Sequence, residues 1–285
     1  MQVDEKYIVR NMTPAEVETI AVEWAATEGW NPGLYDARMF YNADPNGFFV
    51  GLLNNVPIAC VSAVAYNAEF GFMGFYVVKP EYRRAGYSLR LYRTALRHLP
   101  TQNIGLDGVV EQQENYRKIG YKMAYRNIRY EGITTQHTSH FPNIFRISDV
   151  SLGSLIAYDS KLFPAPRAKF IEEWIDQPEG AAFAAVIDGA ILGYGVIRKC
   201  RIGYKIGPLF ADSKEIASQL LCSLTSSVLP NQPFYLDIPD ENVRSVELVN
   251  DFSMLKVFET ARMYSKSFPK IEMDKIFGIT SFELG

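Results

Sequence analysis

Arg83, Arg84 and Gly86 form a short basic loop between a very apolar segment and an amphipathic one. The apolar segment, residues 70–78, consists almost wholly of aliphatic, aromatic and glycine residues, which is typical of a buried strand. After the loop, apolar residues recur at helical spacing until Pro100 ends the pattern. A helix that starts after a glycine loop offers unpaired N–H groups and a positive dipole end to an anion. The residue types therefore predict a phosphate-binding loop.

Two better-known phosphate loops do not match this loop, because it contains neither Gly-Lys-Ser/Thr nor G-x-G-x-x-G. The spacing R-x-x-G-x-S, from Arg83 through Gly86 to Ser88, resembles the acyl-CoA signature Q/R-x-x-G-x-G/A of the GCN5-related N-acetyltransferases, the GNAT superfamily. Ser88 stands where that signature has glycine or alanine. On the residues alone, an ordinary helix N-terminus with solvated arginines stays open as the alternative.

A second segment, N-Y-R-K-I-G-Y at residues 115–121, resembles the L-Y-x-K-x-G-F segment of the same superfamily. Asn115 replaces its leucine, and Tyr121 replaces its phenylalanine. Residues 104–110 have the pattern of a short buried strand, and Gly120 suits the positive φ at which many helices end. Two motifs in the superfamily's order predict a GNAT fold, of the α/β (α+β) class.

The composition is that of an ordinary globular chain. With 285 residues, 48% hydrophobic and 21% charged, the chain is long for one domain and sufficient for two. The net charge of −3 and the pI near 5.7 argue against nucleic acid as the main partner. The first residues are charged and no apolar run approaches about 18 residues, so we expect no signal peptide, no membrane contact and a cytoplasmic protein.

The residue types give little support for a metal site or for a catalytic triad. Cys60, Cys200 and Cys222 form no C-x-x-C pair, which fits a reducing compartment and no structural zinc. His137 and His140 have no further Cys or His nearby, so we interpret them as solvated linker residues and expect no metal. The third histidine lies near the end of a predicted helix, so a Ser-His-Asp or Cys-His system is not indicated.

The sequence divides into two similar halves. Residues 1–132 carry both motifs, residues 133–143 form a polar linker, and residues 144–285 repeat the same order of elements at low identity. Asp107 and Asp237 occupy equivalent places, which suggests a role in the fold for this carboxylate. We expect two tandem GNAT-like domains, each with a mixed, mostly antiparallel central sheet flanked by helices, the second copy being degenerate.

The second half lacks the residues on which the chemistry would depend. Residues 210–217 replace the basic loop, contain no glycine and carry Asp212 and Glu215, which would repel a pyrophosphate. Val249 stands where Tyr116 stands in the first half. Over essentially its full length the chain resembles bacterial tandem acetyltransferases with a YitH-type C-terminal domain. The segments that carry this resemblance are E-G-W-N-P-G-L-Y-D (28–36), Y-K-I-G-P-L-F-A-D (204–212) and F-E-T-A-R-M-Y (258–264).

The resemblance implies transfer of an acetyl group from acetyl-CoA directly to a primary amine of a small molecule or peptide. A backbone N–H near Val78 would bind the thioester oxygen, and Tyr116 would protonate the leaving thiolate. The second half would bind no CoA and would help to shape the acceptor pocket. The cofactor-binding positions implied are Tyr76, Val77, Val78, Arg83, Arg84, Ala85, Gly86, Tyr87, Ser88 and Asn115.

The acceptor side is less defined. Candidates for amine recognition, with core and turn roles equally open, are Trp30, Asn31, Asp36 and Phe40. The general base stays open among a water chain and four carboxylates, Asp36, Asp107, Glu111 and Glu114. A non-catalytic acetyl-CoA sensor or scaffold is the main alternative, and a purely structural interaction protein is another. The sequence leaves the oligomeric state open between a monomer with an internal pseudo-dimer and a homodimer.

Overall fold

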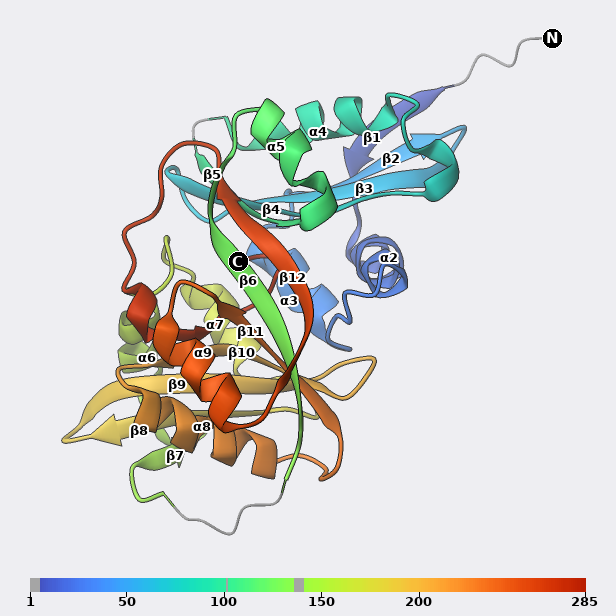
Figure 1. Cartoon of the computed structure of the whole chain (residues 1–285). Helices are drawn as coiled ribbons and strands as arrows, with labels where there is room; N and C mark the ends of the chain where they lie inside the picture. The colour runs from blue at the N-terminus through green and yellow to red at the C-terminus, as the bar shows by residue number, and fades with distance from the viewer. Residues whose placement is uncertain (1–5, 101, 136–140) are drawn as a thin grey trace.

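One continuous sheet runs through the computed structural model, which describes residues 6–100, 102–135 and 141–285. In Figure 1 the first half forms the upper part and the second half the lower part. The 13 strands found in these residues are β1 (Tyr7–Asn11), β2 (Phe48–Leu53), β3 (Val56–Ala65), β4 (Phe70–Val78), β5 (Asn103–Val109), β6 (Lys122–Ile133), β7 (Ile144–Arg146), β8 (Ala181–Ile187), β9 (Ala190–Lys199), β10 (Tyr204–Ala211), β11 (Pro233–Pro239), β12 (Leu255–Tyr264) and β13 (Ile276–Gly278). The predicted fold class is confirmed.

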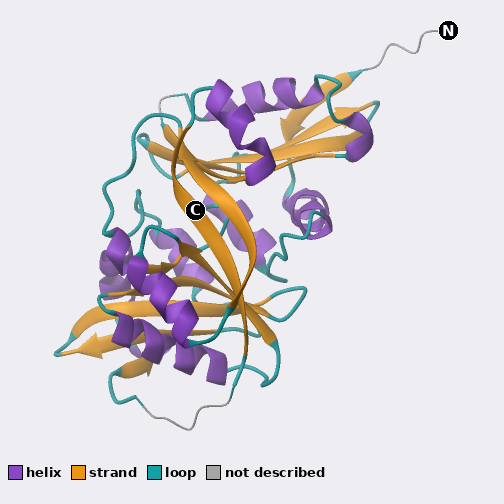
Figure 2. Cartoon of the chain, in the orientation of Figure 1, coloured by secondary structure: helices purple, strands orange, loops and turns teal. Residues whose placement is uncertain are grey.

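Helices cover the outer faces of the sheet and fill the space between the halves (Figure 2). They are α1 (Pro14–Glu16), α2 (Glu23–Thr27), α3 (Asp36–Ala43), α4 (Tyr87–His98), α5 (Gln113–Lys118), α6 (Leu152–Asp159), α7 (Ala168–Trp174), α8 (Lys214–Ser226) and α9 (Val243–Asp251), with a π-helical segment (Val17–Val22) between α1 and α2. α4 and α5 pack outside the first half, α8 and α9 outside the second, and a shared apolar core lies between. No helix of the described ranges is long and apolar enough to cross a membrane.

Local sequence signals set the caps and turns. Thr13 and Glu16 form a capping box, in which the Glu16 carboxylate accepts the Thr13 N–H at 2.9 Å and the Thr13 hydroxyl accepts the Glu16 N–H. Asn54 and Asn55 turn β2 into β3 with φ of 50° and 68°, the pair of positive values that a tight hairpin turn needs. The Asp188–Gly189 turn repeats this device in the second half.

The last strands of the two halves are exchanged. The sheet order is β1-β2-β3-β4-β5-β12-β6-β11-β10-β9-β8-β7, so β12 lies next to β5 and β6 lies next to β11. β6 and β12 run side by side from the upper to the lower part of the molecule (Figure 1). The sheet is therefore shared between the halves, Ile133 of the predicted linker belongs to β6, and the domain boundaries stay a prediction. His137 and His140 fall in residues 136–140, outside the described residues.

Two equivalent buried ion pairs hold the exchanged strands. Asp107 of β5 lies directly opposite Arg262 of β12 and accepts its Nε–H and Nη2–H at 2.9 and 2.6 Å. Asp237 of β11 lies opposite Arg129 of β6 and accepts the same two donors at 2.7 and 2.8 Å. Both pairs are two-pronged and almost wholly buried, so each carboxylate has a structural role, as the equivalence of the two aspartates suggested.

Removal of one member of such a pair leaves a buried arginine without its counter-charge. We expect Asp237→Asn to lower the free energy of unfolding by about 3–5 kcal/mol, measured by urea denaturation. Glu114→Gln is the control, because it removes an exposed carboxylate that pairs with Arg117, and its cost should stay below about 1 kcal/mol. Equal costs for the two variants would contradict the structural role of the Asp237 pair.

Candidate functional site

The basic loop follows a strand that separates from its neighbour. β4 and β5 run parallel and pair from Phe70 opposite Asn103 to Met73 opposite Leu106. Beyond that point β4 remains paired with β3, and β5 pairs with β12. None of the described strands pairs with the edge of residues 74–78 that faces away from β3. A V-shaped gap between β4 and β5 therefore opens toward the loop.

A β-bulge turns the end of β4. Phe75 has a φ of 47°, and the register between β3 and β4 shifts at this point. With the extra residue, Tyr76 packs on the α4 side of the sheet together with Met73, while Phe75 packs in the core between the halves. The bulge therefore presents Tyr76 and the last residues of β4 to the face that carries the loop.

The end of β4 directs a backbone donor into the gap. The N–H of Lys79 donates to the carbonyl of Ile58 on β3 at 3.0 Å, so the N–H of Val78 points to the opposite edge. The Val78 carbonyl, on that same edge, accepts the Nε–H of Arg83 at 2.8 Å. The Arg83 guanidinium also pairs with Glu28 at 2.6 Å, so this arginine shapes the loop and its charge is already balanced.

The N-terminus of α4 is open. Gly86 is its N-cap residue with a φ of 85°, and no side chain caps the first turn. A Cβ added at Gly86 would meet no atom within 4 Å, so the residue that starts the helix borders open space. Arg84 and Ala85 are exposed beside it, and in the described part of the chain no carboxylate forms an ion pair with Arg84. The loop thus combines an uncapped helix end with an unneutralised cation, as an anion site requires.

Two tyrosines anchor the first turn of α4 to the sheet. The Tyr76 hydroxyl donates to the carbonyl of Ser88 at 2.9 Å, and the Tyr7 hydroxyl donates to that of Tyr87 at 3.2 Å. Burial raises the pKa of Tyr76 to about 12, so this anchor stays protonated at neutral pH. The loop is therefore held in place by side chains that do not block its N–H groups.

Tyr116 lies over β5, beside the gap. A Cβ on Gly108 would lie only 2.7 Å from the Tyr116 ring, so the glycine leaves room for the ring to approach the strand. Burial raises the pKa of Tyr116, with the neighbouring Tyr76 and Tyr92 adding to the shift, so its phenol remains a proton donor. Asn115, one residue earlier, is exposed and donates to Gln112 at 2.7 Å.

The equivalent place in the second half is closed. Ser213 caps α8 by accepting the N–H of Ile216 at 3.3 Å, so one donor that would bind an anion is already used. β10 and β11 separate after Ile206 opposite Leu236, and β13 pairs with β10 beyond that point. The N–H of Ile279 then donates to the carbonyl of Asp237 on β11 at 2.9 Å. The chain itself fills the second gap.

Of the four predicted acceptor residues, three make contacts between the halves. The Asn31 side chain exchanges two hydrogen bonds with the main chain of Ile202, and Asp36 is buried against Arg198. Phe40 lies in the shared core. Trp30 is half-buried, so of the four its ring is the side chain that remains available to a ligand. These residues thus position the halves, and their role in acceptor recognition stays a prediction.

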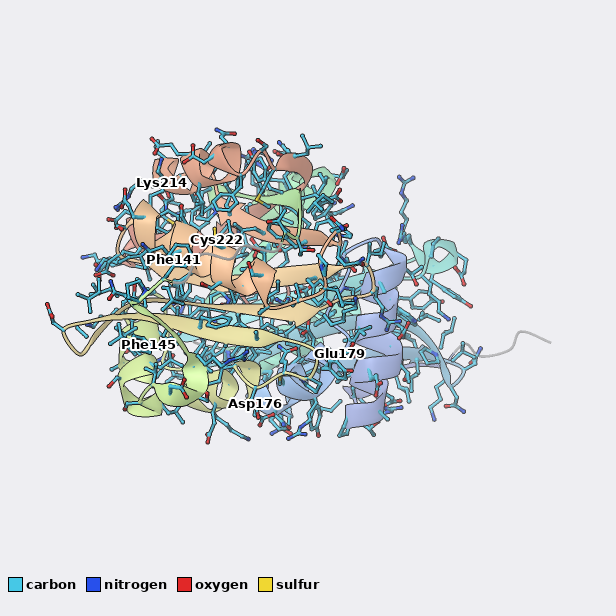
Figure 3. The ribbon with its side chains drawn as sticks, turned by 90° about the horizontal axis from the view of Figure 1, so that it is seen from below. Phe141, Phe145, Asp176, Glu179, Lys214 and Cys222 are labelled. Carbon is cyan, nitrogen blue, oxygen red and sulfur yellow. The ribbon has the colours of Figure 1, made fainter. Side chains whose placement is uncertain are left out.

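A groove of about 430 Å³ lies between α3 and α7, apart from the loop. Its lining includes Glu18, Arg38, Glu172 and Asp176, and the Tyr35 hydroxyl at its edge donates to Glu179 at 2.6 Å. Figure 3 shows Asp176 and Glu179 together at the surface. The groove shares no residue with the V-shaped gap, so we do not assign the chemistry to it.

Family comparisons match both halves of the chain. Residues 17–121 match the model described as "Acetyltransferase (GNAT) family", and residues 155–278 match the one described as "Acetyltransferase (GNAT) domain". The halves therefore are two GNAT domains in tandem, as the sequence predicted.

Full-length relatives give the same result. The holothin acyltransferase of Pseudoalteromonas sp. (strain SANK 73390) is 33% identical over 274 residues, which cover 95% of this chain and 93% of that protein. The uncharacterized N-acetyltransferase YitH of Bacillus subtilis (strain 168) is 22% identical, with 80% and 81% covered. The crystal structure of a putative acetyltransferase from Pyrococcus horikoshii has the same fold, with a TM-score of 0.83, 22% identity, and 98% and 96% covered. This chain belongs to the GNAT superfamily and is an acyltransferase with two GNAT domains.

Proposed function

We propose that the chain transfers an acetyl group from acetyl-CoA to a primary amine in the first half. The observation that carries this proposal is the contrast between the two helix ends: α4 is uncapped and faces open space, whereas α8 is capped by Ser213. The pyrophosphate would accept N–H groups of the α4 first turn, with Arg84 adding charge. Pantetheine would lie in the gap along residues 76–78.

Two groups of the first half divide the chemistry. The Val78 N–H, which points into the gap, would hold the thioester oxygen as negative charge develops on it. The amine would attack the carbonyl carbon, the C–S bond would break, and Tyr116 would give its proton to the sulfur. Burial keeps the Tyr116 phenol protonated at neutral pH, as a proton donor must be, and its raised pKa makes it a weaker acid than an exposed phenol.

The alternative is a sensor that binds acetyl-CoA without transferring the acetyl group. Free-thiol release in the presence of acetyl-CoA separates the two, with a panel of holothin, benzylamine, spermidine and a lysine-containing peptide. Holothin is included because a relative that covers the whole chain is named for it. Thiol release that depends on one of these amines supports the enzyme; acetyl-CoA binding without release on any of them supports the sensor.

Gly86 tests the cofactor loop. Gly86→Asp would place a negative charge in the open space before α4, so acetyl-CoA binding measured by calorimetry should weaken by at least about 2 kcal/mol. Gly189→Asp is the matched control, because Gly189 has a similar φ of 76° and also no atom within 4 Å of an added Cβ. Parent-like binding by Gly86→Asp would show that the site lies elsewhere.

Tyr116 tests the proton donor. Tyr116→Phe keeps the ring over Gly108 and removes the hydroxyl, so stability should hold while kcat falls by roughly 10²-fold. Tyr121→Phe is the control, since its ring lies 6.0 Å from that of Tyr116 and its hydroxyl interacts with Tyr92. An unchanged kcat for Tyr116→Phe in single-turnover kinetics would remove Tyr116 from the mechanism.

A further inference from the structure

The carboxylates considered first as general bases are engaged or exposed. Asp36 and Asp107 are each buried in an ion pair with an arginine of the second half. Glu114 pairs with Arg117 on the surface of α5, and Glu111 is exposed on the turn after β5. None of these four is a buried carboxylate that is free to take a proton from a bound amine.

Another acidic residue, Glu283, has its main chain at the point where β4 and β5 separate. The segment 279–285 follows β13 and runs between the halves, where all its residues are buried. Its main chain at Glu283 packs directly on Gly74, the first residue of β4 beyond the last β5 pair, and a Cβ at Gly74 would collide with it. The Tyr66 hydroxyl fixes the next residue, since it donates to the Leu284 carbonyl at 2.8 Å. The main chain of Glu283 is thus held at the point where β4 and β5 separate.

The Glu283 carboxylate is buried and unpartnered. The residue is only 2% exposed, and neither carboxylate oxygen has a hydrogen-bond partner among the described residues. A buried charged group without a partner is costly, and native structures rarely retain one without a reason. The missing donor can therefore come from a ligand.

The charges that face Glu283 come from three strands. Arg129 on β6, Arg198 on β9 and Lys205 on β10 lie near enough for their charges to interact with it. Arg129 is already paired with Asp237, and the Trp30 carbonyl accepts a hydrogen bond from the Lys205 amino group at 3.3 Å. The Nε–H of Arg198 is bonded to Asp36, whereas its two terminal nitrogens have no hydrogen-bond partner among the described residues. No hydrogen bond or ion pair within the described residues joins Glu283 to any of these cations.

Two partly exposed aromatic residues lie next to this cluster. The Trp30 carbonyl accepts a hydrogen bond from Arg129 as well as from Lys205, which places the Trp30 loop beside the cluster. The ring of Phe258 on β12 lies 5.9 Å from that of Phe282, the neighbour of Glu283. Trp30 and Phe258 are both partly exposed, so the surroundings of the cluster reach the surface beside these two residues.

We propose that Glu283 is the general base of the first-half site, a role that rests on the proposed acetyl transfer. Its carboxylate accepts a hydrogen bond from the amine N–H and takes that proton as the N–C bond forms. The C–S bond breaks, and the proton of Tyr116 passes to the sulfur. Glu283 then releases its proton to water and Tyr116 regains one from water, so the sum is amine plus acetyl-CoA giving amide plus CoA thiol.

The test compares Glu283→Gln, Glu283→Asp and Glu272→Gln in the full chain. Glu272 is the matched control, because it lies in the same C-terminal region but is exposed and paired with Lys275. With holothin and benzylamine as probes, kcat should fall by at least about 10²-fold in Glu283→Gln, with acetyl-CoA affinity unchanged. In Glu283→Asp kcat should be intermediate, and in the control it should stay at the parent value.

The outcomes separate this inference from the proposed function. Parent-like kcat in Glu283→Gln would overturn the inference and leave acetyl transfer standing. A parent protein that binds acetyl-CoA and acetylates neither probe nor any other amine of the panel would overturn both. If Glu283→Gln no longer folds, shown by loss of acetyl-CoA binding, Glu283→Asp decides: a reduced kcat at unchanged acetyl-CoA affinity supports the base, and a parent kcat overturns it.

Discussion

The two buried Asp–Arg pairs between exchanged strands are the interaction on which the rest of the molecule depends. Each joins the fifth strand position of one half to the last strand of the other, Asp107 with Arg262 and Asp237 with Arg129. Buried ion pairs contribute little net stability compared with apolar contacts, yet a single broken one is costly. Since the two pairs occupy equivalent positions, we infer that they fix the register of each last strand against its partner strand.

The exchange makes the second half part of the first half's site. β5 carries Gly108 beneath Tyr116. The edge of β5 that faces away from the gap pairs with β12 of the second half. The segment that fills the second gap continues beyond β13 and reaches Gly74, where the strands that border the first gap begin to separate. A degenerate copy can thus persist, because its strands and its final segment complete the copy for which we propose the cofactor site.

Much of this arrangement follows from local sequence. Three local signals each require a particular backbone geometry, and the structure has that geometry in each case. They are the capping box at Thr13, the paired asparagines after β2 and the glycine before α4. The helix that follows the acidic, glycine-free second loop is capped by Ser213, unlike α4, and the absence of CoA binding in the second half stays a prediction.

What the sequence could not supply comes from contacts between distant segments. The strand exchange depends on which half's last strand pairs with β5, and both choices satisfy the same apolar pattern. The equivalence of Asp107 and Asp237 is a signal of the two buried ion pairs once each aspartate is matched to an arginine of a last strand. Glu283 gave no signal, since a lone glutamate near the end of the sequence acquires meaning only through its burial against Gly74.

The central claim is that one half binds the cofactor and the other completes the site. Hydrogen–deuterium exchange on the full chain, with and without saturating acetyl-CoA, tests it most directly. The account predicts slower exchange of the amides at residues 76–78 and in the first turn of α4, and no change in the first turn of α8 or at β13. Protection at α8 and β13, or none at α4, would contradict it.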